Sequence, residues 1–429
     1  MRRPRPRFVP RSEFGITAAL AVLASAAAWF RLPPTTQQTV WAEDGTIFLN
    51  DAISGAPASH LFAGYAGYLQ LLPRLIADGV IRTVDIADAG IMINLASCAV
   101  VGLGASLVYW CARDVIAARP LRLVLCSITV FAPLAPIELL GNAANLHWFF
   151  IWITLWILLY QPRTRIGAWM LAIVTLIGAM SEIQVLVLVP LLLVNVRGHN
   201  VWPPRIGLAV GLVAQIITTL LSPRVAHAGG LGGALRAYVG QVALPNFAAN
   251  RQTMTAALGE QALVWEVLAI VPFVLSVLVC LRWGTALQRV AALYLVPGSF
   301  VIWVVDSYLN GYGGSPIHHA PFVFIRYAVI PSMLLLASIV LAAQVLASRR
   351  APIAWIGTAA VAALVVLMVV QYIPTETNRS NGPTWANAIG AARKSCESLA
   401  SGMNQLVVTA PRTKTALWTF PISCERLAK

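Results

Sequence analysis

Residues 353–373 read IAWIGTAAVAALVVLMVVQYI, an apolar run of 21 residues that contains no charged side chain. A helix of about 20 apolar residues spans the ~30 Å hydrocarbon core of a bilayer. Ten more apolar segments recur along the 429-residue chain, which is 59% hydrophobic and only 11% charged. The sequence therefore predicts an all-α polytopic membrane protein with about 11 transmembrane helices, over residues 14–32, 87–111, 122–139, 146–160, 166–181, 183–195, 206–222, 262–281, 290–307, 327–346 and 353–373.

One boundary among these segments has two interpretations. The segments 166–181 and 183–195 are each short for a full span, so AMSEIQ (179–184) could be a kink within a single tilted helix. Basic residues precede and follow the pair, in QPRTR (161–165) and VRGHNVWPPR (196–205), which favours two crossings.

The charged residues divide between the two sets of connecting loops. If the N-terminus is cytoplasmic, the loops on that side, with Arg122 at a boundary, hold 16 of the 30 Lys and Arg residues but only Glu13 and Asp114 among the acids. An excess of Lys and Arg marks cytoplasmic loops, so we expect a multi-pass membrane protein with a cytoplasmic N-terminus and an extracytoplasmic C-terminus. The predicted organisation is a basic cytoplasmic N-terminus (1–13), a transmembrane domain (14–373) with a long first outer loop (33–86), and an extracytoplasmic C-terminal unit (374–429).

The first outer loop concentrates acidic residues in TVWAEDGTIFLNDA (39–52). Adjacent residues of a helix or strand point in different directions, so at most one of Glu43 and Asp44 is expected to face a substrate. A structural alternative is that Asp44, followed by Gly45, N-caps a short helix over TIFLNDAIS (46–54).

An aromatic segment, HLFAGYAGYLQLLPRLIADGV (60–80), follows in the same loop. Tyr65, Tyr68 and their apolar neighbours recur at helical spacing, which predicts an interfacial helix. This helix could rest on the outer leaflet, or it could form a wall for a lipid-linked substrate with Arg74 near the headgroups.

Further polar residues lie at or within the outer ends of the predicted helices. A carboxylate at helix depth costs about 2.5 to 3.5 kcal/mol on insertion scales, so these side chains are expected either to line a polar cavity or to pair between helices. They are Glu138, Asn142, Asn145, His147, Glu182 and Asp306. Near the tenth helix, Arg326 could bind phosphate or extend toward lipid headgroups, and His318 with His319 supplies two ligands, too few for a metal site.

The C-terminal residues are predicted to form a small α/β unit outside the membrane. WANAIGAARKSCESLA (385–400) has helical spacing, and NQLVVTA (404–410) and ALWTF (416–420) indicate short strands. Cys396 and Cys424 are the only cysteines outside apolar segments, and an oxidising exterior would allow them to form a disulfide, with two free thiols as the alternative.

Together, WAEDG (41–45), GYLQLLPRL (67–75), GNAANLHW (141–148), RYAVIP (326–331) and the Cys-paired tail resemble the GT-C superfamily of membrane glycosyltransferases, in particular bacterial, actinobacterial members that act on the cell envelope. The resemblance implies a GT-C-like fold, a location in the bacterial plasma membrane, and an inverting transfer of a sugar from a polyprenyl-phosphate donor to a hydroxyl of an envelope glycan, glycolipid or protein. It implies that Asp44, in preference to Glu43, is the general base. The residues implied at the donor phosphate and lipid are Arg326, His318, His319, Arg74, Tyr65 and Tyr68, and those at the sugar or acceptor are Glu138, Asn142, Asn145, His147 and Glu182.

Other functions remain open at this point. No DxD spacing accompanies Asp44, so no metal cofactor is expected, although one branch of the superfamily requires a divalent cation. A transporter or flippase for a lipid-linked saccharide would also need a polar cavity, but it should contain inverted repeats. An envelope glycan ligase or polymerase is a third candidate. The basic residues lie in short turns without interleaved aromatics, which argues against nucleic-acid binding.

Overall fold

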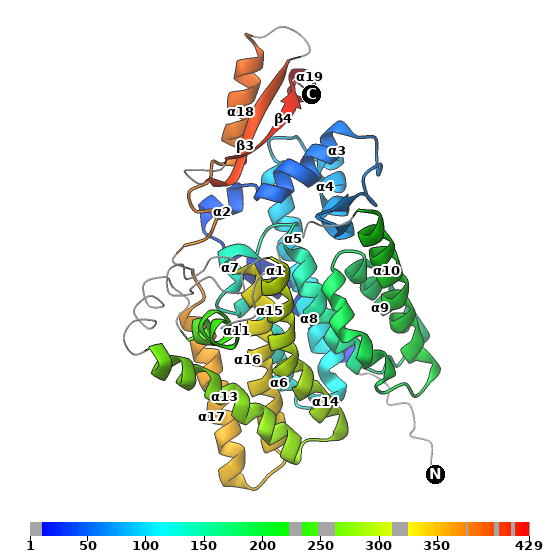
Figure 1. Ribbon diagram of the computed structural model, residues 1–429, viewed down its shortest axis with the longest axis vertical. Coiled ribbons are helices and arrows are strands. Elements are labelled where there is room, and N and C mark those ends of the chain that lie inside the picture. The colour runs from blue at the N-terminus through cyan, green and yellow to red at the C-terminus, as the bar shows by residue number, and fades with distance from the viewer. Residues whose placement is uncertain are drawn as a thin grey trace.

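The computed structural model describes residues 11–222, 234–247, 262–310, 325–374, 376–398, 403–412 and 417–428, which form a long helical body with a small C-terminal unit at one end (Figure 1). In this part of the chain, eight helices are long and apolar enough to cross a membrane, judged by length and composition. This finding confirms the coarse prediction of an all-α polytopic membrane protein. The eight are Glu13–Phe30, Ala89–Asp114, Arg119–Glu138, His199–Leu221, Leu263–Trp283, Ala286–Leu309, Arg326–Leu346 and Pro352–Val370.

These eight spans differ in how deeply they are buried. In the most apolar stretch of each helix, 89% of the residues of α16 are buried, compared with 17% for α17 and 11% for α1. Helix α16 therefore lies at the centre of the body, whereas α1 and α17 present apolar side chains outward. Outward apolar faces of this extent suit contact with lipid. The helices are α1 (Arg11–Phe30), α5 (Ala89–Cys111) with η2 (Ala112–Asp114), α6 (Arg119–Phe131) with α7 (Ala135–Glu138), η4 (His199–Val201) with α10 (Trp202–Leu221), α13 (Ala262–Trp283), α14 (Ala286–Leu295) with α15 (Pro297–Leu309), α16 (Arg326–Leu346) and α17 (Ala351–Val370). Between α10 and α13 lie α11 (Ala234–Tyr238), η5 (Val239–Ala243) and η6 (Leu244–Asn246).

The remaining three predicted segments are shorter apolar helices: α8 (Leu146–Leu159), α9 (Arg165–Ala179) and the 3₁₀ helix η3 (Ile183–Leu193). After η3, Asn195 accepts a hydrogen bond at 2.5 Å from Gln161, which lies just before α9. The chain therefore returns to the level at which α9 begins. Residues 165–193 form a helical hairpin, with its turn around Glu182, and not a single tilted helix.

The predicted basic loops gather at one end of the body. Arg119, at the start of α6, forms an ion pair with Glu13 of α1 at 2.5 Å. Gln288, in α14, donates to the carbonyl of Val115 at 3.0 Å. These contacts join loops that are far apart in the sequence. The acidic first loop and the C-terminal unit lie at the opposite end (Figure 1).

The first loop contains several short elements, namely α2 (Pro34–Gln38), the π-helical turn η1 (Asp44–Leu49), α3 (Asn50–Ser54), β1 (Gly64–Tyr65), β2 (Tyr68–Leu69) and α4 (Leu71–Thr83). The predicted interfacial helix over 60–80 is correct only from Leu71 onward. Tyr65 and Tyr68 are instead paired in an antiparallel β-hairpin. Ala66 and Gly67 both have positive φ, at 53° and 86°, as a two-residue hairpin turn of type I′ requires and a helix excludes.

The C-terminal unit has the predicted α/β composition. It consists of α18 (Trp385–Cys396), β3 (Asn404–Arg412), β4 (Leu417–Ser423) and α19 (Cys424–Leu427), and the two strands pair antiparallel. Cys396 and Cys424 form the predicted disulfide. The unit is attached to the first loop: the Trp385 indole donates to the carbonyl of Ile86 at 2.6 Å.

Candidate active site

A cavity of about 590 Å³ lies at the end of the body that carries the first loop. Its walls come from the first loop, the first turns of α8 and η3, the last turns of α10 and α15, and the start of α16. Helix ends from separate parts of the sequence thus converge on one space. Among the described residues, the acidic and basic side chains that line it are Glu43, Glu182, Asp306, Arg326 and His147.

Glu43 is the residue of the acidic motif that faces this cavity. Its Oε1 lies 3.5 Å from Nη1 of Arg326, and the same nitrogen lies 3.4 Å from Oε1 of Glu138. Glu43 Oε2 is buried and has no hydrogen-bond partner among the described residues. One guanidinium therefore contacts two carboxylates, and Glu43 has a second, buried oxygen that is an unused hydrogen-bond acceptor in the described chain.

Asp44 points the other way and is fully buried. Its Oδ1 accepts the amide N–H of Ala144 at 2.7 Å and its Oδ2 that of Ala143 at 3.1 Å. The alternative that Asp44 caps its own helix is therefore wrong, although the predicted helix exists as η1 and α3. Burial raises the pKa of Asp44 to about 7, against the effect of both amides and of Arg379, which favour the ionised form.

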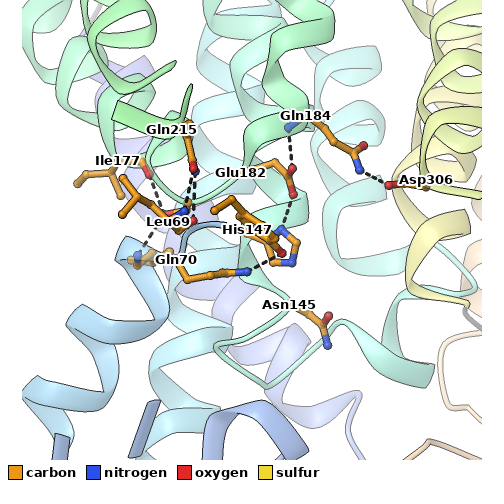
Figure 2. Close-up of polar contacts among 12 residues, drawn as sticks. Leu69, Gln70, Asn145, His147, Ile177, Glu182, Gln184, Gln215 and Asp306 are labelled. Atoms are coloured by element: carbon orange, nitrogen blue, oxygen red, sulfur yellow. Dashed lines mark hydrogen bonds and ion pairs between the residues drawn. The ribbon is translucent and has the colours of Figure 1, made fainter. Parts of the chain in front are cut away.

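A chain of polar contacts crosses the cavity wall from α8 to α15 (Figure 2). The Nδ1 atom of His147 pairs with Oε2 of Glu182. Oε1 of Glu182 accepts the amide N–H of Gln184 at 2.7 Å, and the side chain of Gln184 donates to Asp306. The turn of the 165–193 hairpin is thereby fixed to two neighbouring helices. His147 is also oriented, with its second ring nitrogen directed away from Glu182.

The β-hairpin forms another wall of the cavity, with Tyr65, Tyr68 and the turn residues between them on the lining. Gln215, in the middle of α10, fixes this hairpin: it accepts from Leu69 N–H at 2.8 Å and donates to the Leu69 carbonyl at 3.1 Å (Figure 2). An amide side chain that makes both bonds replaces a neighbouring strand. A short hairpin that would be marginal alone is thus held in place.

Several polar atoms that belong to the lining residues are buried and lack a hydrogen-bond partner within the described chain. They are Oε1 of Gln70, Nε1 of Trp148, Oε1 of Gln184 and Oγ1 of Thr219. Burying such a group unpaired costs about 1 to 3 kcal/mol. A ligand with several hydroxyl groups could satisfy these donors and acceptors.

The structure brings seven of the predicted site residues together on the cavity lining: Glu43, Tyr65, Tyr68, Asn145, His147, Glu182 and Arg326. Glu138 lies behind this lining, against Arg326. Asn142 is fully buried and shapes the loop, because its Oδ1 accepts from Asn145 N–H at 2.9 Å. Arg74 is not at a lipid headgroup; it is buried in an ion pair with Asp51 at 2.6 Å.

His318 and His319 lie outside the described residues. Within the described residues, no group of three or more His, Cys, Asp or Glu side chains could hold a metal ion. Sequence reasoning missed Gln70, Gln184, Trp148 and Thr219 on the lining. The glutamines each lie within two residues of a predicted site residue, which was the available signal, whereas Thr219 had none.

Comparison of the chain with protein-family models, with curated proteins and with solved structures finds no match in any of the three.

Proposed function

We propose that this protein is an integral membrane glycosyltransferase of the GT-C type, which moves a sugar from a polyprenyl-phosphate donor to an acceptor hydroxyl. The observation that carries the proposal is the cavity, whose described lining includes the guanidinium of Arg326, the unpartnered Oε2 of Glu43 and several other polar atoms without a partner among the described residues. A volume of about 590 Å³ falls in the range of small-molecule sites, roughly 300 to 1,000 Å³. The hydroxyl-rich ligand would be the sugar.

The proposed reaction is a single displacement at the anomeric carbon. The acceptor oxygen forms the new C–O bond, its proton passes to Glu43, and the phosphate leaves with the electron pair of the bond that breaks. The configuration is inverted. A general base must lie within about 3 Å of the hydroxyl. What supports Glu43 in this role is that it lines the cavity and that its Oε2 has no partner in the described chain. Glu43, and not the enclosed Asp44, is therefore the base in this proposal.

Arg326 is proposed to stabilise the leaving phosphate. Both of its carboxylate contacts use Nη1, whereas a guanidinium has five N–H donors and can bind a phosphate through two of them. Arg326 could therefore remain tied to Glu43 and Glu138 while it binds the donor. His147, oriented by Glu182, is proposed to donate to the sugar or the phosphate from its second ring nitrogen.

The membrane arrangement is part of the same proposal. The basic loops at one end would lie in the bacterial cytoplasm and the cavity would open on the other side. The three shorter apolar helices would complete eleven crossings. The acceptor would be an envelope glycan, glycolipid or protein.

The test uses purified protein in lipid nanodiscs, a panel of polyprenyl-phosphate sugars and a labelled acceptor. Glu43→Gln should lower sugar transfer by at least about 100-fold, since general-base catalysis contributes about 10² to 10⁴. Glu397→Gln, an exposed substitution in the C-terminal unit, is the matched control and should leave the rate unchanged.

Transfer by Glu43→Gln at the rate of the control would refute Glu43 as the base. Movement of a lipid-linked saccharide across vesicles without a new glycosidic bond would favour a transporter or flippase. Transfer of preassembled glycans alone would favour a ligase or polymerase.

A further inference from the structure

We propose that Asp44 is a positioning residue and that it acts with Arg379 of the C-terminal segment to hold the loop 140–145, which forms one wall of the cavity. The geometric part of this inference is independent of the reaction. Its kinetic part rests on the proposed glycosyl transfer.

The side chain of Asp44 holds the loop 140–145 by accepting hydrogen bonds from the backbone of the loop. Both carboxylate oxygens accept amide N–H groups, from Ala143 and Ala144, and hydrogen bonds to a charged group are roughly twice as strong as those between neutral groups. The next residue, Asn145, lines the cavity, and α8 begins immediately after it. The position of His147 in the first turn of α8 therefore depends on two bonds that end on Asp44.

Arg379 holds the same loop from the other side. It is 2% exposed and donates to the carbonyls of Leu140 and Gly141, each at 2.7 Å, and to Oδ1 of Asn94 at 3.1 Å. Gly141 has φ +68°, and a Cβ there would meet a side-chain carbon of Leu32 at 2.2 Å. Glycine is therefore needed for the turn that presents these carbonyls to the guanidinium.

Asp44 and Arg379 also interact electrostatically, and they carry opposite charges once Asp44 is ionised, above about pH 7. Arg379 is buried, and its interaction with Asp44 favours the charged form of each. A buried cation is costly unless it is paired. Asp44 thus has two functions: it receives the loop amides and it balances the guanidinium that binds the loop carbonyls.

The C-terminal residues make three further contacts with this region. Asn378 N–H donates to the carbonyl of Ile137 at 2.9 Å, and its side chain donates to Oε2 of Glu138 at 3.2 Å. Thr409 of β3 covers Gly45, where an added Cβ would meet its Cγ2 at 2.3 Å. The C-terminal unit therefore packs against both the acidic motif and the loop, so it is a structural part of the cavity.

Hydrogen–deuterium exchange of the full-length protein tests the geometric part directly. The peptide that spans residues 139–147 contains the two amides bound to Asp44. In Asp44→Asn and in Arg379→Gln these amides should exchange at least about tenfold faster, the effect of losing a hydrogen bond to a charged group. Glu43→Gln and the control Glu397→Gln should leave this peptide unchanged.

A kinetic readout separates positioning from base catalysis. Residual sugar transfer by Asp44→Asn should keep most of the wild-type kcat with a raised KM, whereas Glu43→Gln should lose kcat at every pH. Arg379→Lys, which keeps the charge but not the fork of donors, should recover part of the protection that Arg379→Gln loses.

Unchanged exchange of the 139–147 peptide in both Asp44→Asn and Arg379→Gln would overturn the inference. So would an Asp44→Asn enzyme that loses all transfer while the peptide stays protected, because Asp44 would then act chemically. Absence of transfer by the wild-type protein, with the predicted exchange, would reject only the proposed function.

Discussion

Asp44 should make the stability of this protein fall as the pH rises, opposite to the usual effect of a carboxylate. Burial raises its pKa from 3.8 to about 7. Between these values the folded chain keeps a proton that the unfolded chain has released, so unfolding becomes easier as the pH rises through this range. A shift of about three units at 1.36 kcal/mol per unit corresponds to about 4 kcal/mol lost between pH 4 and pH 8.

The assay is thermal unfolding of the purified protein in one detergent, at pH steps from 4.5 to 8. Asp44→Asn removes the titrating group, so the wild type should lose stability relative to this variant as the pH rises. Asp85 should not mask this trend, because the N–H of Ala87 and Arg393 lower its pKa from 3.8, and its contribution to stability is therefore lost only below this pH range. Parallel curves for the wild type and Asp44→Asn across this range would refute the reasoning.

Three other predictions concern the elements around the cavity. Cys396→Ser should destabilise the C-terminal unit by about 3 to 4 kcal/mol, since the bridge to Cys424 spans 28 residues; an unchanged rate of limited proteolysis would contradict this. Ala66→Gly should be neutral or stabilising by up to about 1 kcal/mol and Ala66→Val destabilising by about 1 to 2 kcal/mol, because the φ of 53° disfavours side chains; equal melting temperatures would count against the type I′ turn. Gly45→Ala should cost about 1 to 3 kcal/mol through overlap with Thr409, and unaltered thermal unfolding would show that the C-terminal unit does not press on this turn.

The helical body was predictable from sequence because spanning a bilayer imposes one strong constraint, the length of the apolar run. Each of the eleven predicted segments coincides with a helix, and eight of these helices have the length and composition of a span. The disulfide was predictable for a similar reason, since only two cysteines lie outside apolar segments.

The β-hairpin was not predicted, because Tyr65 and Tyr68 are three residues apart and this spacing also fits a helix. What decides the structure there is the backbone of Ala66 and Gly67, and the sequence reasoning gave that turn pair no weight. The partner that stabilises the hairpin, Gln215, lies 146 residues away from Leu69. A pairing of that kind has no local signal.

The sequence predicted that at most one of Glu43 and Asp44 faces a ligand, but it could not show which of the two. Local helix geometry predicts that only one of the two acids faces a ligand. The structure agrees, because Glu43 lines the cavity and Asp44 does not. Which one faces it depends on backbone amides 99 and 100 residues away. Backbone groups are present at every residue and therefore leave no pattern in a sequence.

The order of the two acids suits the two environments. Successive residues on a helix differ in direction by about 100°, so a side chain at 43 that enters the cavity leaves its neighbour at 44 directed toward the protein interior. Aspartate loses less rotamer freedom than glutamate on burial, which favours it at the fully enclosed position against two amides. Glutamate is longer and reaches Arg326 at 3.5 Å while its other oxygen has no partner among the described residues. The side chain of Glu43 is 15% exposed, whereas Asp44 is fully buried. Of the two acids, Glu43 alone therefore combines a place on the cavity lining with an ion pair to a nearby cation.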